Sequence, residues 1–377
     1  MKMTGMVRIL AAALCFTAVT GGTMFARPVD NRPLIQIALL LDTSNSMDGL
    51  INQAKSQLWK IVSESGRMTR GGERARLEVA LYEYGNDANS VISGYVRQVV
   101  PFTNDLDRLS ACLFELDTYG GSEYCGAVIK KSLNELDWSG RESDLRIVYI
   151  AGNEPFTQGL VDYRSAGKKA SRMGVVVNTI HCGDREEGFR TGWADGARIT
   201  GGEYLTIEGD FQYQYVPCPQ DDRLSELNSR LNDTYLAFGD EGEKRKEMQS
   251  EQDSMAEELN KSGFYERAKV KSSASYSNSG WDLVDATSSG AVVLSEVQDD
   301  DLPAAVRALP LAARQAFVEG KLTERKKIQA EIAALSAERE SYLAENAAAA
   351  PADEALDTAI LAPLSALAKD KGFVVEE

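Results

Sequence analysis

The sequence predicts an α/β protein whose doubly wound, mainly parallel sheet is followed by a helix-rich carboxyl-terminal region. Two observations lead to this fold class. Apolar runs of strand length alternate with segments of helical periodicity over residues 34–239, which is the order expected for parallel strands joined by helices. From residue 240 the chain becomes charge-rich and poor in glycine, and its periodicity is mainly helical.

The first apolar run, residues 34–41, is long enough for a strand buried on both faces, as parallel sheets require. A polar loop and a helix with apolar residues recurring over 50–62 follow it. The same order continues along the chain. The further strands expected are residues 77–84, 91–102 (a strand pair or one long edge strand), 147–151, 175–180 and 204–207. The further helices expected are residues 106–116, 127–136, 163–173 and 223–235.

Changes in composition divide the chain into four parts. We expect a signal peptide over residues 1–26, the α/β domain over 34–239, the helix-rich region over 240–346, and an Ala/Pro linker with a terminal helix over 347–377. Within the helix-rich region, residues 292–297 are expected as a short strand. A charged helix there carries a narrow apolar stripe, which suits an intramolecular helix pair or a short coiled coil. The stripe consists of Ile328, Ile332, Leu335 and Tyr342.

Composition and charge bound the possible partners. The chain has 377 residues, of which 43% are hydrophobic and 26% charged, values typical of soluble globular proteins. The formal net charge of -16 would repel a phosphate backbone or an anionic membrane surface. We therefore exclude nucleic acid as a partner.

The amino terminus has the pattern of a secretory signal. Lys2 and Arg8 precede an apolar run, and small residues follow up to a possible cleavage point after Ala26. The run is shorter than the roughly 20 residues that a membrane span needs, and no later segment offers a transmembrane segment. We expect the protein to be exported and to be periplasmic or secreted.

Four cysteines remain once this signal is removed, and an oxidising compartment favours disulfides among them. The sequence does not choose among the three pairings, and free buried thiols are the alternative. The absence of C-x-x-C argues against a zinc knuckle and a thioredoxin-type redox site. The disulfide candidates are Cys112, Cys125, Cys182 and Cys218.

The pattern that carries most chemical information is Asp42-x-Ser44-x-Ser46, which follows the first strand and precedes a helix. Mg²⁺ prefers oxygen ligands, and two hydroxyls two residues apart can reach one ion while a carboxylate supplies charge. This pattern resembles the metal-ion-dependent adhesion site of von Willebrand factor type A domains, whose fold is a doubly wound sheet. In that family the carboxylate usually acts through a water molecule.

The resemblance continues in two later loops. The family has a threonine in a Gly-Gly-Thr loop, and Gly-Gly-Ser at residues 120–122 gives Ser122 that role. The family also has an aspartate after the central strand, typically in Thr-Asp-Gly-Glu-Pro, where this chain reads Ala-Gly-Asn-Glu-Pro at residues 151–155. Gly152 therefore stands where the family has its aspartate, and the site has one carboxylate fewer.

This loss should weaken metal binding, because hard cations are held largely by ligand charge. Asn153 could add a carbonyl oxygen, and Glu154, Glu123 or Asp184 a carboxylate through water. The alternative is that the three serines only cap loops and a helix N-terminus. The resemblance thus implies a degenerate site for Mg²⁺ or another divalent cation, weak or absent, with Asp42, Ser44, Ser46, Ser122, Asn153 and Glu154 as candidate ligands.

In this family the metal usually completes its coordination with a carboxylate from a partner protein. The resemblance therefore implies an extracytoplasmic protein-binding or assembly module and not an enzyme. The alternative is a docking subunit of an enzyme or chaperone assembly, with activity in the carboxyl-terminal region or in a partner.

Two further groups of residues have competing interpretations. His181 and Cys182 have the types of a base and a nucleophile, but neighbours on a strand tend to point to opposite faces, so we expect structural roles for both. Phe211, Tyr213 and Tyr215 alternate as on an edge strand, and they either pack under the helix-rich region or form an aromatic recognition patch. Trp281 carries the same ambiguity, and we expect it to anchor the two regions to each other.

Overall fold

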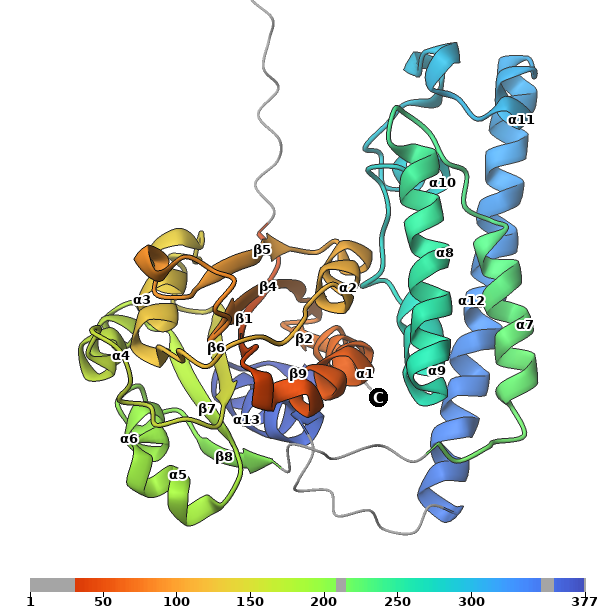
Figure 1. Ribbon diagram of the computed structural model, residues 1–377. Helices are drawn as coiled ribbons and strands as arrows, with labels where there is room; N and C mark the ends of the chain where they lie inside the picture. Colours follow the sequence, from red (N-terminus) through yellow and green to blue (C-terminus); the bar gives the residue numbers. More distant parts are fainter. Residues whose placement is uncertain (1–30, 208–214, 347–355, 376–377) are drawn as a thin grey trace, which may run out of the picture. The chain divides into compact units, whose positions relative to one another are not determined.

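The computed structural model describes residues 31–207, 215–346 and 356–375. Its centre is a six-stranded sheet with strand order β5-β4-β1-β6-β7-β8 (Figure 1). All neighbouring pairs are parallel except β4 and β5, so the sheet is mainly parallel, with an antiparallel edge strand. The strands are β1 (Leu34–Asp42), β4 (Arg76–Tyr84), β5 (Arg97–Thr103), β6 (Leu145–Gly152), β7 (Val176–Cys182) and β8 (Tyr204–Ile207).

Helices cover both faces of this sheet, as the continuous apolar strands require. All nine residues of β1 are buried, and their side chains alternate between two separate apolar clusters. One face packs against α1 (Asp48–Ser65), α2 (Leu106–Phe114) and α13 (Leu356–Asp370). The other packs against α3 (Cys125–Glu135), α4 (Tyr163–Arg172) and α6 (Trp193–Arg198), with α5 (Arg185–Thr191) beside α6 (Figure 1). The doubly wound fold class is confirmed.

Two predicted strands differ in the structure. Residues 91–93 form a 3-10 turn, η2, because Gly94 and Tyr95 adopt positive φ angles of 71° and 58° that bend the chain before β5 begins at Arg97. Residues 292–297 do not form a strand. Their backbone bonds locally, from the amide of Glu296 to the carbonyl of Val293, and Leu294 of the 3-10 turn η3 (Leu294–Glu296) enters a small apolar cluster.

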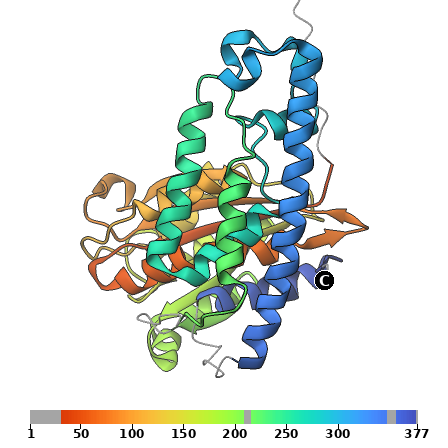
Figure 2. The ribbon, with the colours of Figure 1, turned by 90° about the vertical axis from the view of Figure 1, so that its right-hand side faces the viewer.

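Past β8 the chain is mainly helical. The 36-residue helix α12 packs against α7, α9 and α10, and Ile328 and Ile332 are buried in this packing, so the apolar stripe is used within the chain (Figures 1 and 2). The helices of this region are α7 (Asp221–Asn232), α8 (Gly242–Leu259), α9 (Lys261–Lys271), α10 (Leu283–Ser288), the short turns η4 (Asp299–Asp301) and α11 (Ala304–Arg307), and α12 (Leu311–Asn346).

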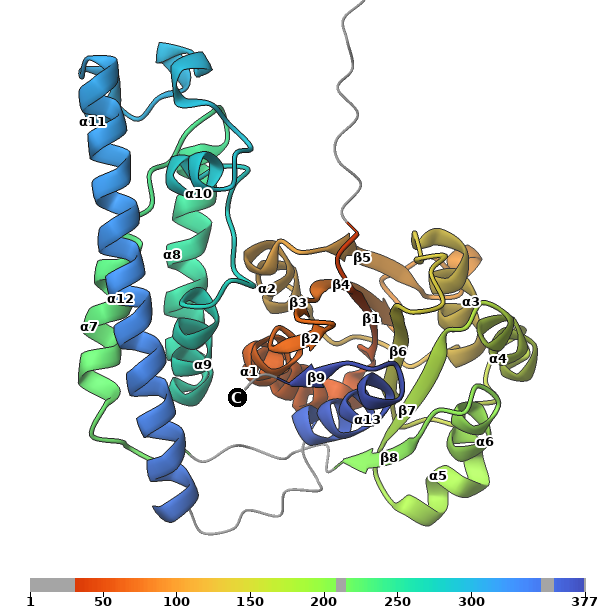
Figure 3. The same cartoon turned by 180° about the vertical axis from the view of Figure 1, so that it is seen from behind.

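The last described elements return to the sheet. α13 contacts α1, β6 and β8, and the hydroxyl of Tyr149 on β6 donates to the carbonyl of Ile360 at 2.8 Å (Figure 3). A small second sheet joins β9 (Val374–Val375) to β2 (Met68–Arg70), which also pairs with β3 (Glu73–Arg74). The boundaries near residues 239 and 346 stay predictions, and any domain that contains the complete sheet packing includes α13.

Within the described ranges, no helix is long and apolar enough to cross a membrane. The predicted export signal lies outside the described residues.

Candidate functional site

Five loops meet where the parallel strands end, and we call this region the carboxyl edge. It comprises residues 43–47 after β1, 85–95 after β4, 115–124 before α3, 153–162 after β6, and residues 183–190, which are the turn after β7 and most of α5. The register of the sheet sets their positions, since Asp42 pairs with Tyr84 and Gly152 with His181. Binding sites in open α/β sheets form at such an edge.

The loop after β1 folds back over the end of its own strand. Asp42 is fully buried, and its Oδ1 atom accepts a hydrogen bond of 2.8 Å from the amide of Ser44. This bond and the 3-10 turn η1 (Asn45–Met47) aim the two serine hydroxyls at each other, with 3.3 Å between the Oγ atoms. Adjacent oxygen ligands of one Mg²⁺ lie about 3 Å apart, so both hydroxyls can serve the same ion.

The structure brings further candidate residues to this point. The Nδ2 atom of Asn153 donates to the Oγ of Ser46 at 3.1 Å. Ser122 reaches the edge through a backbone bridge with Gly85. Glu154 turns instead toward Gln158, whose Nε2 donates to its carboxylate at 3.0 Å. Asn153 thus lies directly beside the serine pair, while the carboxylate of Glu154 already has a donor.

Tyr84 leaves no room for a side chain at residue 152. A Cβ atom added at Gly152 would lie 2.4 Å from the Tyr84 hydroxyl and 2.9 Å from Oδ2 of Asp42. Tyr84 is fully buried, and its hydroxyl donates to the carbonyl of Ala151 at 2.9 Å. The tyrosine hydroxyl therefore occupies the space that the first side-chain atom of the family's aspartate would need. Sequence reasoning found the glycine but missed Tyr84.

Glu123 brings a second carboxyl group next to Asp42. Its side chain is 3% exposed, and it lies beside Asp42, next to Gly85. Gly85, with a φ of 83°, makes room for this contact, because a Cβ there would lie 2.6 Å from Oδ1 of Asp42 and 2.8 Å from Cγ of Glu123. The edge therefore contains a buried pair of facing carboxyl groups.

Burial raises the pKa of both groups. Burial is the main cause of the raised pKa of Asp42. Burial, followed by the hydrogen bond and charge of Asp42, raises the pKa of Glu123 to about 9.

The side-chain oxygens at this edge fit a hard divalent cation. Oδ2 of Asp42, Oε2 of Glu123 and Oδ1 of Asn153 are buried, and in the described part of the chain no hydrogen-bond donor reaches them. These atoms and the serine hydroxyls are all oxygens, the ligand type that Mg²⁺, Mn²⁺ and Ca²⁺ prefer. No trio of His, Cys, Asp or Glu side chains suited to a metal ion occurs among the described residues, so a cation here would depend on two carboxylates together with neutral oxygens.

The cysteines and the histidine lie elsewhere in the packing. Cys112, Cys125, Cys182 and Cys218 are free thiols in the structure, and a disulfide among them stays a prediction. Cys182 packs in the apolar cluster on the α1 face of the sheet. The ring of His181 lies 5.6 Å from that of Trp193 on the opposite face, and its Nε2 atom lies 3.2 Å from the carbonyl of Asn153. The two neighbours therefore do not form a nucleophile and base pair.

The predicted aromatic patch is described only in part. Phe211 and Tyr213 lie outside the described residues. The hydroxyl of Tyr215 donates to Asp221 at 2.6 Å, and its ring stacks on Tyr265, so it packs against the helical region. Trp281 is buried beside Tyr235, in the same apolar cluster as one face of the sheet.

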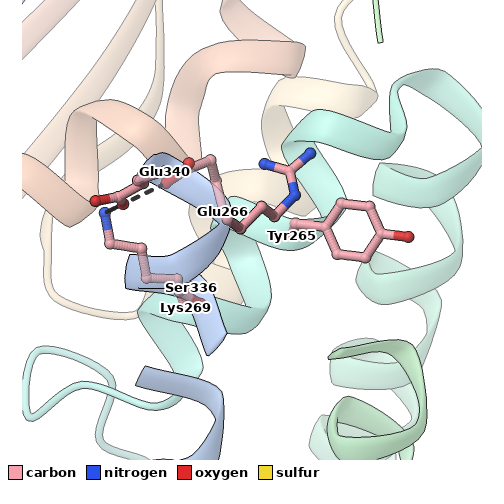
Figure 4. Close-up of a pocket in the computed structure, with 6 residues that line it drawn as sticks. Tyr265, Glu266, Lys269, Ser336 and Glu340 are labelled. Atoms are coloured by element: carbon pink, nitrogen blue, oxygen red, sulfur yellow. Dashed lines mark hydrogen bonds and ion pairs between the residues drawn. The ribbon is translucent and has the colours of Figure 1, made fainter. Parts of the chain in front are cut away.

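A small cavity between α9 and α12 offers no second site (Figure 4). Its volume is about 10 Å³, enough for no more than one water molecule. Lys269 closes it with an ion pair of 2.5 Å to Glu340 (Figure 4). The lining residues are Tyr265, Glu266, Lys269, Ser336, Arg339 and Glu340.

Residues 36–190 match the family model of the von Willebrand factor type A domain, so this part of the chain is a domain of that family. The match contains every loop of the carboxyl edge. Domains of this family are in general protein-interaction modules and not enzymes. A search of curated proteins gave no match.

Solved structures with a similar fold include two from Bacteroides and one from a mussel. BatB from Bacteroides thetaiotaomicron has 16% identity and a TM-score of 0.35, over 46% of this chain and 90% of that chain. An aerotolerance-related membrane protein from Bacteroides fragilis has 18% identity and a TM-score of 0.33, over 47% and 93%. Proximal thread matrix protein 1 from the mussel byssus, with a zinc-occupied metal-ion-dependent adhesion motif, has 13% identity and a TM-score of 0.35, over 48% and 43%.

Proposed function

We propose that the protein is an exported binding or assembly module and that the carboxyl edge is its recognition face. The observation that carries this proposal is that exposed apolar side chains lie on the segments of the carboxyl edge, which also contains the oxygen cluster. They are Val91, Ile92, Tyr119, Leu160 and Phe189. Exposed apolar groups gathered at one end of a fold are typical of protein-binding surfaces.

Two of these side chains are almost completely open to solvent. Ile92 is 95% exposed and Leu160 102% exposed, although both follow strands whose own residues are buried. Contact with a partner protein would remove this apolar surface from water. These side chains favour binding at the edge whether or not a metal is present.

The charge of the edge indicates how a cation would act there. The five segments contain nine Asp and Glu residues and only two Arg residues. Such a surface repels a carboxylate offered by a partner unless a cation lies between them. We therefore expect binding of a carboxylate-bearing partner to depend on metal.

Within this proposal, the hydroxyls of Ser44, Ser46 and Ser122 hold a divalent cation such as Mg²⁺ over Asp42. A bound cation supplies positive charge and an open coordination position for the partner's carboxylate. Two hydrogen bonds orient the first two hydroxyls. The amide of Ser44 donates to Asp42, and the side chain of Asn153 donates to the hydroxyl of Ser46. With glycine at residue 152, we expect the affinity for metal to be modest.

Calorimetric titration with Mg²⁺, Mn²⁺ and Ca²⁺ tests the cation. We expect saturable binding by the mature protein and none by the triple variant Ser44→Ala, Ser46→Ala, Ser122→Ala. Binding that survives in the variant would place the cation elsewhere.

Site-specific photo-crosslinking in cells that export the protein tests the recognition face. A photoreactive phenylalanine analogue at residue 92 or 160 should form one defined crosslinked species, and a chelator should remove it. The matched control is residue 293 in the helical region, where the native valine is 54% exposed. An equal crosslinking pattern from all three positions would show that the apolar side chains of the edge are not a specific interface.

A further inference from the structure

We propose that Glu123 supplies the second carboxylate of the divalent-cation site, in place of the one that is missing at Gly152. This inference rests on the proposed cation site at the carboxyl edge and names a ligand that the family pattern does not contain. Asp42, at the end of β1, and Glu123, in the loop before α3, would both be ligands, and the hydroxyls of Ser44 and Ser46 would complete the protein's share.

The backbone fixes Glu123 in the required place. The preceding residue, Ser122, forms the bridge with Gly85, and the amide of Glu123 donates to Oε1 of Gln158 at 3.3 Å. The chain then enters α3 at Cys125. The side chain therefore starts from a bridged segment, and it is buried beside Asp42.

The facing carboxyl groups require a positive charge. Oδ2 of Asp42 and Oε2 of Glu123 are both buried, and no amide, hydroxyl or basic side chain in the described structure donates to either. Two ionised carboxylates left in this state would each carry an uncompensated desolvation penalty and would repel each other. One divalent cation between the two oxygens satisfies both at once.

Other carboxylates at the edge already have partners. Glu154 accepts from Gln158, as described above. Asp184 is exposed and caps α5, where its Oδ1 atom accepts from the amide of Glu187 at 2.9 Å. Glu123 alone among these three combines burial, contact with Asp42 and a free carboxylate oxygen.

The space left by Gly152 agrees with this assignment. Tyr84 fills the position of the family's aspartate, and its hydroxyl is directed to the carbonyl of Ala151. A second carboxylate therefore cannot come from β6, while the loop before α3 brings one to the same Asp42. Two carboxylates with hydroxyl and amide oxygens favour Mg²⁺ or Mn²⁺ over softer ions.

Titration with Mn²⁺ alone, followed by the electron paramagnetic resonance signal of free Mn²⁺, tests the inference on the full mature chain. We expect Glu123→Gln to weaken Mn²⁺ binding at least about tenfold, because the variant keeps the shape of the side chain but removes its charge. The matched control is Glu186→Gln, an exposed glutamate at the same edge, which should bind Mn²⁺ like the wild type. Thermal unfolding followed by circular dichroism checks that both variants are folded.

A second variant keeps the test decisive if Glu123→Gln does not fold. Glu123→Asp keeps the charge on a shorter side chain, so its affinity should lie between those of the wild type and Glu123→Gln. Equal affinity of the wild type and Glu123→Gln, with loss of binding in the serine variant, would overturn the inference and leave the proposed cation site intact. No Mn²⁺ binding by the wild type up to about 10 mM would overturn both, while the crosslinking test of the recognition face would stand on its own.

Discussion

Gly152 and Tyr84 form a matched pair at the residue scale. The glycine lacks the carboxylate that the family pattern has, and the tyrosine hydroxyl fills the space beside it. Because Tyr84 is buried and hydrogen-bonded to Ala151, the hydroxyl cannot swing out of the way without losing that bond. A change at either residue should therefore alter the packing of the other.

We predict that Gly152→Ala lowers the free energy of unfolding by about 1–3 kcal/mol, because the added methyl group overlaps the Tyr84 hydroxyl. The measurement is urea denaturation followed by tryptophan fluorescence. Gly121→Ala is the control, since a Cβ there has nothing within 4 Å, and its effect should stay within about 0.5 kcal/mol.

A double-mutant cycle with Tyr84→Phe examines the cause. Tyr84→Phe alone should cost about 1–2 kcal/mol, because the carbonyl of Ala151 loses its donor. The double variant should lose less stability than the sum of the two single changes. Strict additivity would mean that the tyrosine hydroxyl does not restrict residue 152.

At the scale of elements, a buried ion network joins α2 to α8 and α9. Arg267 on α9 is fully buried and bonds Asp107 on α2 at 2.7 Å and Asp253 on α8 at 2.5 Å. Lys271 on α9 is also fully buried and bonds Asp253 at 2.8 Å. The contacts between the sheet's covering helices and the helical region are thus partly ionic, and they depend on the correct pairing of each charge.

We predict that Asp253→Asn lowers the free energy of unfolding at pH 7 by about 3–5 kcal/mol, because Arg267 and Lys271 lose their shared counter-charge. The effect should depend on pH. Burial by itself would raise the pKa of Asp253, but Lys271 and Arg267 hold it well below its usual value of 3.8. Stability from this group is therefore fully present above pH 3.8 and is lost as the pH falls toward the folded-state pKa.

Urea denaturation at a series of pH values measures this dependence. The difference between the wild type and Asp253→Asn should shrink steadily below pH 3.8. Glu251→Gln, an exposed change on the same helix, is the control and should show a small difference at every pH. If the difference in the free energy of unfolding between the wild type and Asp253→Asn stays constant down to the lowest pH measured, the network does not lower the pKa of Asp253.

At the scale of the whole molecule, the last helix completes the packing of the first sheet. Leu364 of α13 is fully buried in the cluster that also contains residues of β1 and α1. Sheet residues more than 200 positions earlier in the chain are thus shielded from solvent by α13. The hydrogen bond from the hydroxyl of Tyr149 to the carbonyl of Ile360 is one such contact.

We predict that Leu364→Ala lowers the free energy of unfolding by about 2–5 kcal/mol, because it leaves a cavity against the sheet. The measurement is urea denaturation monitored by circular dichroism. Ala366→Ser on the exposed side of the same helix should change stability by no more than about 0.5 kcal/mol. If both variants unfold at the same urea concentration, α13 does not contribute to the stability of the sheet.

Local patterns sufficed to predict the central strands and the main helices. The runs that became β1, β4, β6 and β7 are continuous and apolar, so their burial on both faces could be read from residue types alone. The prediction of a short strand over 292–297 was wrong. A short apolar run occurs both in strands and in turns whose leucine packs into an apolar cluster, as Leu294 does here. The bend at Gly94 and Tyr95 was likewise set by backbone angles that the residue types allow but do not require.

The sequence by itself determined the sheet, the order of the loops at its carboxyl edge and the missing carboxylate at Gly152, because each is written in neighbouring residues or in a short motif. Only the tertiary structure decided that Tyr84 fills the space beside Gly152, that Glu123 faces Asp42, and that α13 covers the sheet. These contacts join residues far apart along the chain, and their distances are set by how strands and helices pack, which no local pattern specifies.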